Sequence, residues 1–150
     1  MITRLWAVLF ICLPPVAAAQ VMIDGPEGDC GFSKLKPRRM ADFVNHSTVE
    51  KHSPQFPPAA EARGLTGTVY VKILINKQGF VERTCPAYIK GKPRPDRTLV
   101  VAAEAAALQW TFAPNFGIEP VGGIRFDYLQ DELVFEFAGH NVTEQPRRTP

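Results

Sequence analysis

The chain of 150 residues has few of the side chains that most often carry out chemistry. Its histidines, His46, His52 and His140, and its three cysteines form no His-x-x-x-His or Cys-x-x-Cys pair. Zinc sites usually need such spacing, so no metal ion or other cofactor is expected. A Gly-x-Ser-x-Gly nucleophile motif and a glycine-rich phosphate loop are missing as well. We therefore expect no catalytic residues and a protein that is not an enzyme.

No large excess of one charge is present either. There are 17 Lys and Arg residues against 15 Asp and Glu residues, and the net charge is +2. Proteins that bind polyanions cluster their cations, whereas here the two signs are interspersed along most of the chain. The run Lys34–Arg39 and the pair Arg147-Arg148 are locally basic, and a solvated face and a polar tail explain them. No nucleic-acid partner is predicted.

A hydrophobic run long enough to cross a membrane is also lacking. The longest candidate, Leu5–Leu13, has nine residues, all apolar, and is followed by Pro14-Pro15. A spanning helix needs roughly 20 apolar residues. Together with Arg4 and the small residues ending at Ala19, this pattern predicts a secretory signal peptide, residues 1–19, cleaved after Ala19. A membrane anchor and a lipidated Cys12 are the weaker alternatives.

Export changes how the remaining cysteines are interpreted. Cleavage leaves only Cys30 and Cys85, and in an oxidising compartment an isolated pair favours a disulfide. Closing a loop of this length would contribute about 3–4 kcal/mol of stability by the chain-entropy estimate. Two buried free thiols are the alternative. The expected organisation is an irregular N-terminal arm at 20–52, a domain at 53–138 and a polar, frayed tail at 139–150.

The strongest local pattern predicts a long helix that starts at Asp96 and runs to Trp110. Pro95 and Pro114 punctuate its two ends, and the Asp96 side chain is suited to cap the first turn. Its apolar residues recur at helical spacing, which predicts one buried stripe. That stripe consists of Leu99, Ala103, Ala106 and Trp110. Because the stripe is rich in alanine, the helix can approach a sheet closely.

Three strands are predicted around this helix. Gly67–Ile75 alternates apolar and polar residues, and a turn at Asn76–Gly79 should return the chain antiparallel over Phe80–Ile89. Pro86 indicates an edge strand or a bulge near Cys85. The third strand region, Ile124–Phe137, changes its alternation, which predicts a bulge or an inserted turn at residues 130–132.

A short helix is predicted at Ser53–Gly64, ahead of the first strand. The order of the elements predicts the α+β class: a small three-stranded antiparallel sheet packed against one long helix and one short helix. Asp131-Glu132 is not a plausible carboxylate pair, because adjacent strand residues point to opposite faces.

The spaced residues from Ser53 to Phe137 resemble the C-terminal domain of the TonB energy-transducer family. An aromatic-Pro pair leads into a Gly-x-x-Gly pair and the first strand, the helix exit carries Trp-x-Phe-x-Pro, and a loop precedes the last strand. The residues that carry this resemblance are Phe56, Pro57, Ala60, Gly64, Gly67, Val69, Val71, Ile75, Gly79, Val81, Ala103, Ala107, Trp110, Phe112, Pro114 and Gly117–Val121. Thr111 stands where the family usually has a basic residue.

The resemblance implies a noncatalytic periplasmic protein-binding module that serves energy transduction and transport. Its partner would be an extended segment of an outer-membrane receptor or another envelope protein, paired as an added strand with the exposed last strand; a second copy of the chain is a further possible partner. The residues assigned to partner binding are Gln55, Phe56, Pro57, Ile124, Phe126, Tyr128, Leu133 and Phe135. A membrane anchor and a long proline-rich spacer, which full transducers carry, are not predicted here.

A second hypothesis makes the chain a structural subunit of a cell-envelope assembly, docked through the N-terminal arm. The possible disulfide at Cys30 would then fix the contact region. Both hypotheses place the protein in the periplasm.

Overall fold

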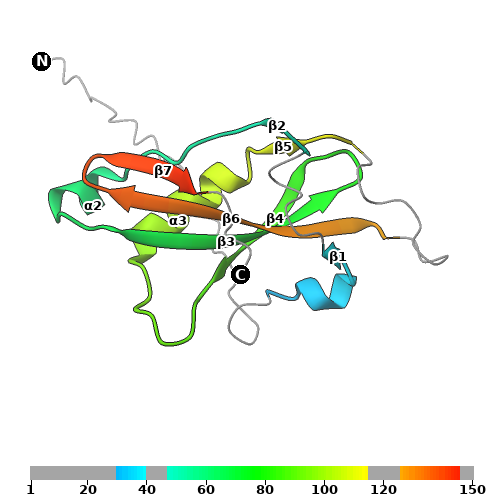
Figure 1. Cartoon of the computed structure of the whole chain (residues 1–150), viewed down its shortest axis with the longest axis horizontal. Coiled ribbons are helices and arrows are strands. Elements are labelled where there is room, and N and C mark those ends of the chain that lie inside the picture. The colour runs from blue at the N-terminus through cyan, green and yellow to red at the C-terminus, as the bar shows by residue number, and fades with distance from the viewer. Residues whose placement is uncertain (1–29, 40–46, 115–125, 146–150) are drawn as a thin grey trace, which may run out of the picture.

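A computed structural model describes residues 30–39, 47–114 and 126–145 of the chain (Figure 1). The predicted signal peptide at 1–19 therefore lies outside the described residues. Two α-helices, one short 3-10 helix and seven strands follow one another within the described ranges. In chain order they are η1 (Phe32–Leu35), β1 (Arg38–Arg39), β2 (Thr48–Glu50), α2 (Pro58–Ala62), β3 (Gly67–Asn76), β4 (Val81–Ala87), α3 (Arg97–Ala107), β5 (Thr111–Phe112), β6 (Tyr128–Ala138) and β7 (Asn141–Gln145).

The main sheet has five strands in the order β1-β6-β3-β4, with β7 also paired to β6. β3 pairs antiparallel with β4 and β6, and β7 pairs antiparallel with β6. β1 instead runs parallel to β6, through Arg38 opposite Leu129 and Arg39 opposite Gln130. The α+β class is confirmed, whereas the prediction of a purely antiparallel, three-stranded sheet is wrong. β2 and β5 form a separate two-stranded sheet.

The two additional strands, β1 and β7, could not be predicted from the sequence for a physical reason. β1 has only two residues, and β7 carries mostly polar residues because it lies at the edge of the sheet. Neither shows the apolar alternation that marks a half-buried strand. The expectation of a frayed tail is wrong for Asn141–Gln145.

β6 is one continuous strand without a bulge. Its pairing with β3 runs unbroken from Phe137 opposite Gly67 to Tyr128 opposite Asn76. The predicted change of register at residues 130–132 is therefore wrong. The error came from the apolar residues at even positions: β6 begins only at Tyr128, and that side chain packs with the Phe32 cluster on the opposite face of the sheet.

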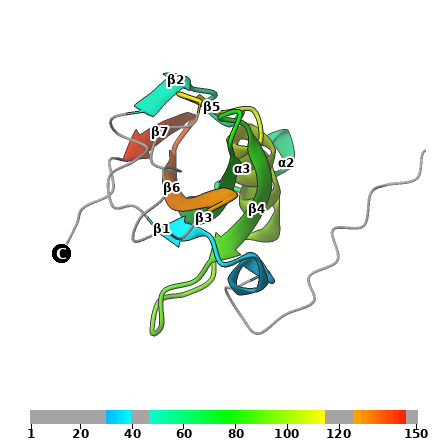
Figure 2. The same ribbon diagram turned by 90° about the vertical axis from the view of Figure 1, so that its right-hand side faces the viewer.

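The core lies between one face of the sheet and α3 (Figure 2). From the central strand, the predicted alternating residues Val69, Val71, Ile73 and Ile75 all enter this core, which confirms that strand. From α3, Leu99, Ala103 and Ala107 pack against them. The small alanines let the helix approach the sheet, as the sequence predicted.

The start of α3 is confirmed. One Asp96 carboxylate oxygen accepts hydrogen bonds from the Thr98 N–H at 2.8 Å and from the Thr98 hydroxyl at 2.6 Å. These bonds, with the nearby Arg63 guanidinium, hold the pKa of Asp96 below its usual value. The helix ends earlier than predicted, at Ala107, so that Trp110 follows the helix and Phe112 lies in β5.

The turn between β3 and β4 requires glycine at position 79. Gly79 has a φ of +87°, and a Cβ there would meet the Phe112 carbonyl oxygen at 2.0 Å. The Gly79 carbonyl in turn accepts the Phe112 N–H at 2.8 Å. This close approach places β5 beside the turn. Pro86 lies in β4 at the edge of the sheet, as predicted, but the register shift is near Val81 rather than near Cys85.

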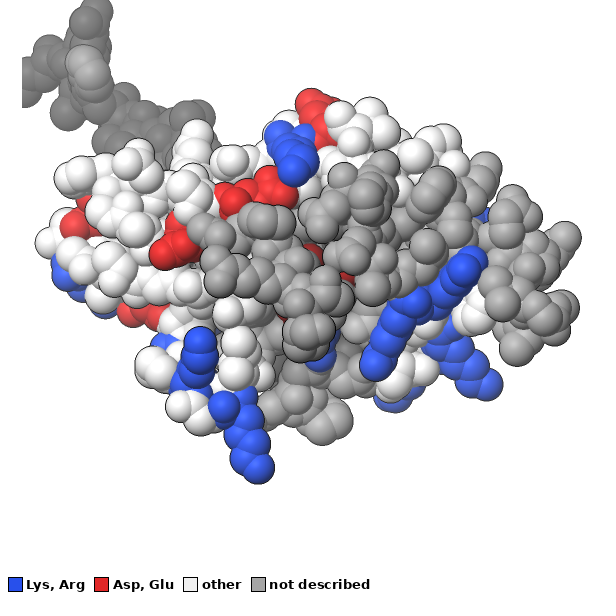
Figure 3. Space-filling view, in the orientation of Figure 1, with Lys and Arg blue, Asp and Glu red and all other residues white. Residues whose placement is uncertain are grey.

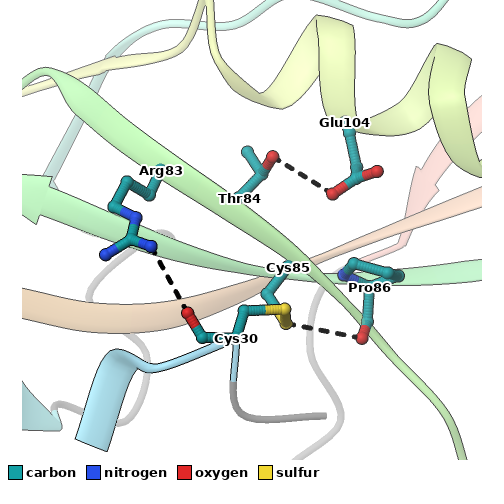
Figure 4. Close-up of a disulfide and its surroundings, with 6 residues drawn as sticks. All are labelled: Cys30, Arg83, Thr84, Cys85, Pro86 and Glu104. Carbon is teal, nitrogen blue, oxygen red and sulfur yellow. Dashed lines mark hydrogen bonds between the residues drawn. A yellow bond between two sulfur atoms is a disulfide. The ribbon is translucent and has the colours of Figure 1, made fainter. Parts of the chain in front are cut away.

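The N-terminal arm covers part of the opposite face of the sheet. Cys30 and Cys85 form a disulfide, so the alternative of two free thiols does not hold (Figure 4). Phe32 follows the disulfide and is fully buried beside Leu74 of β3. Arg83 donates a hydrogen bond to the Cys30 carbonyl at 3.5 Å. The segment of the arm at 30–35 is thus fixed to the sheet by a covalent bond and a buried aromatic ring.

Replacing Cys30 and Cys85 together with serine is expected to lower the free energy of unfolding by about 2–4 kcal/mol, because the unfolded chain regains loop entropy. Urea denaturation followed by circular dichroism measures the loss. Alkylation of Cys30 or Cys85 in the unreduced parent chain would contradict the assignment.

Candidate functional site

An apolar groove lies between the segment 55–58 and the outer face of α3. Its volume is about 550 Å³, which is in the range of binding pockets. Three of the residues predicted to bind a partner line one side of it. The lining residues are Gln55, Phe56, Pro57, Pro58, Arg97, Thr98, Val101, Ala102 and Ala105.

Trp110 fixes the segment that forms the first wall of this groove. Its indole N–H donates a hydrogen bond to the His52 carbonyl at 2.8 Å, and the Lys51 ammonium lies 5.4 Å from the ring centroid. Phe56 is held further along by an edge-on contact with Phe137, with ring centroids 5.6 Å apart. The segment therefore has little freedom to close the groove or to move away from α3.

The outer face of α3 forms the second wall. Val101 is 56% exposed there, beside Ala102 and Ala105. Globular helices usually place polar residues on the face away from the core, so an apolar outer face indicates a contact surface. The buried stripe predicted from the sequence does not include these residues. The uninterrupted apolar run Leu99–Ala103 was the available signal.

One end of the groove is positively charged. Arg97 lines it at the start of α3 and has no ion pair among the described residues. Arg63 nearby is paired with Asp96, at 3.4 Å. A partner that places a carboxylate beside Arg97 would gain a charge-assisted hydrogen bond.

The other residues predicted to bind a partner do not join this groove. Leu133 and Phe135 are buried in the core, with 2% and 0% exposure. Tyr128 points to the opposite face and donates its hydroxyl to Glu82 at 3.2 Å. Phe126 packs against the core cluster, and Ile124 lies outside the described residues.

The free edge expected on the last predicted strand is also not where the sequence placed it. β1 covers the Leu129-Gln130 end of β6, and β7 covers Val134–Ala138. The prediction that Ile124–Phe137 is an open edge is therefore wrong for these residues. Among the described strands, β1 and β7 are the outermost on this side of the sheet, and β7 is the longer of the two.

The described ranges contain no cluster of His, Cys, Asp and Glu that is suited to a metal ion, and no helix long and apolar enough to cross a bilayer. The carboxyl group of Glu104 lies between α3 and β4, and burial there raises its pKa. The Thr84 hydroxyl donates a hydrogen bond to it at 3.2 Å, which opposes part of that rise (Figure 4). It does not line the groove.

Glu104 makes stability depend on pH. Because its pKa in the folded state is raised above 4.5, the stability contribution of this group is present below that value and is lost as the pH rises through the folded-state pKa. The variant Glu104→Gln carries no such charge. As the pH rises from about 4 to about 8, the free energy of unfolding of Glu104→Gln should therefore increase relative to that of the parent chain.

Urea denaturation across that pH range measures the difference. Thr84→Val removes the opposing hydrogen bond and should make the loss of stability with pH steeper than in the parent chain. Parallel curves for Glu104→Gln and the parent chain would contradict the assignment.

Comparison with known proteins agrees with the resemblance predicted from the sequence. Residues 52–122 match the family model described as Gram-negative bacterial TonB protein C-terminal. The solution NMR structure of the Pseudomonas aeruginosa TonB C-terminal domain matches with 24% identity and a TM-score of 0.45, covering 60% of this chain and 82% of that one. No curated protein is significantly similar to the chain.

Proposed function

Because residues 52–122 match the family model of the TonB C-terminal domain, we propose that the chain is a noncatalytic protein-binding module of the periplasm. Its partner is an extended segment of an outer-membrane receptor or another envelope protein. The family has a protein-binding role in envelope energy transduction. The observation that carries the proposal is the apolar groove between segment 55–58 and α3.

The groove defines the chemistry of the partner. Its walls are mostly apolar, so it suits apolar side chains that leave water on binding. Arg97 at one end favours a carboxylate next to those side chains. The walls are fixed before binding by Trp110 and by α3, which lowers the entropy cost of association. A short extended segment with apolar residues and one acidic residue fits these features.

Strand pairing supplies the second part of the proposed contact. The outer edge of β7 has no paired strand among the described residues, so its backbone groups are suited to accept an extended segment. Val142 of β7 packs against the core cluster that Phe56 also contacts, and it pairs with Phe137. This cluster connects β7 with the groove wall. A second copy of the chain is an alternative occupant of the same edge.

The alternative of a structural subunit docked through the N-terminal arm is less well supported. The apolar anchor of the arm, Phe32, is already buried against Leu74 within the same chain. The large apolar side chains that the described arm residues do expose are Leu35 and Val49, and neither of them lines the groove.

The variant Val101→Glu tests the groove. A carboxylate in the apolar wall must be desolvated when a partner docks, so the affinity for receptor segments should fall by about tenfold or more. Isothermal titration calorimetry with synthetic peptides from the periplasm-facing segments of outer-membrane receptors measures the change. Because Val101 is exposed, the fold should be retained.

Val49→Glu is the matched control, because Val49 is 71% exposed and does not line the groove. It should bind the same peptides with the affinity of the parent chain. Equal affinities of Val101→Glu and Val49→Glu would contradict the proposed site.

Hydrogen exchange tests strand pairing separately. When a saturating peptide is added, the amides of Asn141–Gln145 that point away from β6 should exchange more slowly, because they gain hydrogen bonds. NMR resolves each amide. Faster exchange across β7 would mean instead that the peptide displaces this strand, and unchanged exchange would remove strand pairing from the proposal.

A further inference from the structure

The loop that follows β4, residues 88–95, projects away from the sheet in two perpendicular views (Figures 1 and 2). Every residue from Tyr88 to Arg94 is exposed. A tight turn forms its tip, in which the Lys92 N–H donates to the Ile89 carbonyl at 3.1 Å and Gly91 has a φ of +83°. We refer to this segment as the 88–95 loop.

The loop combines exposed apolar side chains with basic residues. Tyr88 and Ile89 are 39% and 41% exposed, although side chains of this kind are usually buried. Lys90, Lys92 and Arg94 follow them, and no acidic residue occurs between Glu82 and Asp96. The Arg94 guanidinium lies 4.9 Å from the centroid of the Tyr88 ring.

The loop does not pack closely on the domain behind it. A hollow of about 540 Å³ lies between the loop and the start of β3, where Thr66, Thr68 and Tyr70 line it. The Tyr88 and Ile89 side chains are therefore not packed into the hydrophobic core, and they remain available to contact a binding partner.

Charge is unevenly distributed on the face shown in Figure 3. Most of the Lys and Arg atoms lie along the lower side, where Figure 1 draws the 88–95 loop and the segment of η1 and β1. Most Asp and Glu atoms lie toward the upper left. The lower side thus favours an anionic surface, whereas the upper left does not.

We propose that the 88–95 loop binds the surface of a bilayer that contains anionic phospholipid. Tyr88 and Ile89 enter the headgroup region, and Lys90 and Lys92 lie against the lipid phosphates. Tyrosine has an apolar ring and a polar hydroxyl, which suits the boundary between headgroups and hydrocarbon, and long cationic side chains reach outward to phosphate. An aliphatic tip favours a membrane over an anionic polymer, because isoleucine offers no charge or stacking surface to a polymer.

The position of the loop relates it to the groove. Asp96 lines the hollow behind the loop, and the next residue, Arg97, lines the groove. A chain attached by the loop would hold its groove close to the bilayer, where segments of membrane proteins emerge. Lipid binding itself does not depend on the proposed peptide binding, and either can fail without the other.

Vesicle sedimentation tests the proposal with the predicted mature chain, residues 20–150, which contains every described residue. The chain should sediment with vesicles of phosphatidylethanolamine and phosphatidylglycerol and not with vesicles of phosphatidylcholine, and binding should weaken as salt is added. Each cation near an anionic surface contributes about fivefold in affinity, so Lys90→Ser with Lys92→Ser should weaken binding by about 10- to 30-fold. Ile89→Ser should weaken binding while leaving its salt dependence unchanged.

The turn between β3 and β4 provides a matched control. Phe80 is 55% exposed there, and Lys77 is paired with Asp127. Lys77→Ser with Phe80→Ser should therefore leave vesicle binding unchanged. The proposal would be overturned if the control variant lost as much vesicle binding as the variant with Lys90→Ser and Lys92→Ser. Equal binding to vesicles of phosphatidylcholine would also overturn it. Sedimentation with purified peptidoglycan but not with vesicles, lost in the loop variants, would also overturn it and assign the loop to an anionic polymer.

Discussion

The packing of Trp110 is the interaction on which the rest of the structure depends. Its ring meets Phe135 of the sheet edge-on, with centroids 6.2 Å apart, while its N–H holds the His52 carbonyl at 2.8 Å. One side chain thus connects the helix exit, the central sheet and the segment that leads to the groove. Because the ring is only 1% exposed, a misplaced or smaller side chain would leave a cavity and free that segment.

The two faces of the sheet have different roles. One face carries α3 and the core, and α3 offers its apolar outer side to the groove. The other face is covered in part by the disulfide-linked arm around Phe32. The covered part of this face is therefore not offered to partners. The proposed binding surfaces are the outer side of α3, the edge of β7 and the loop after β4.

Residues with a strong periodic pattern could be predicted from the sequence, and residues whose position depends on distant contacts could not. The alternation of β3 and the cap at Asp96 are local, so both were predicted correctly. β1 and β7 exist because β6 offers them an edge, which no local pattern reveals. Tyr128 suggested a change of register because it packs with the Phe32 cluster, which forms only when the arm folds onto the sheet. Of the site, only the wall at 55–57 was predicted, through the resemblance. Val101 was not predicted, because it lies outside the apolar stripe that faces the core.

The central claim is that the groove between segment 55–58 and α3 receives the partner. Intermolecular nuclear Overhauser effects between a bound receptor peptide and the methyl groups of Val101, Ala102 and Ala105 test it most directly. The account predicts such effects from apolar peptide side chains, together with a peptide carboxylate placed near Arg97. A bound peptide that shows effects to the 88–95 loop or to β7 alone, and none to these methyl groups, would contradict it.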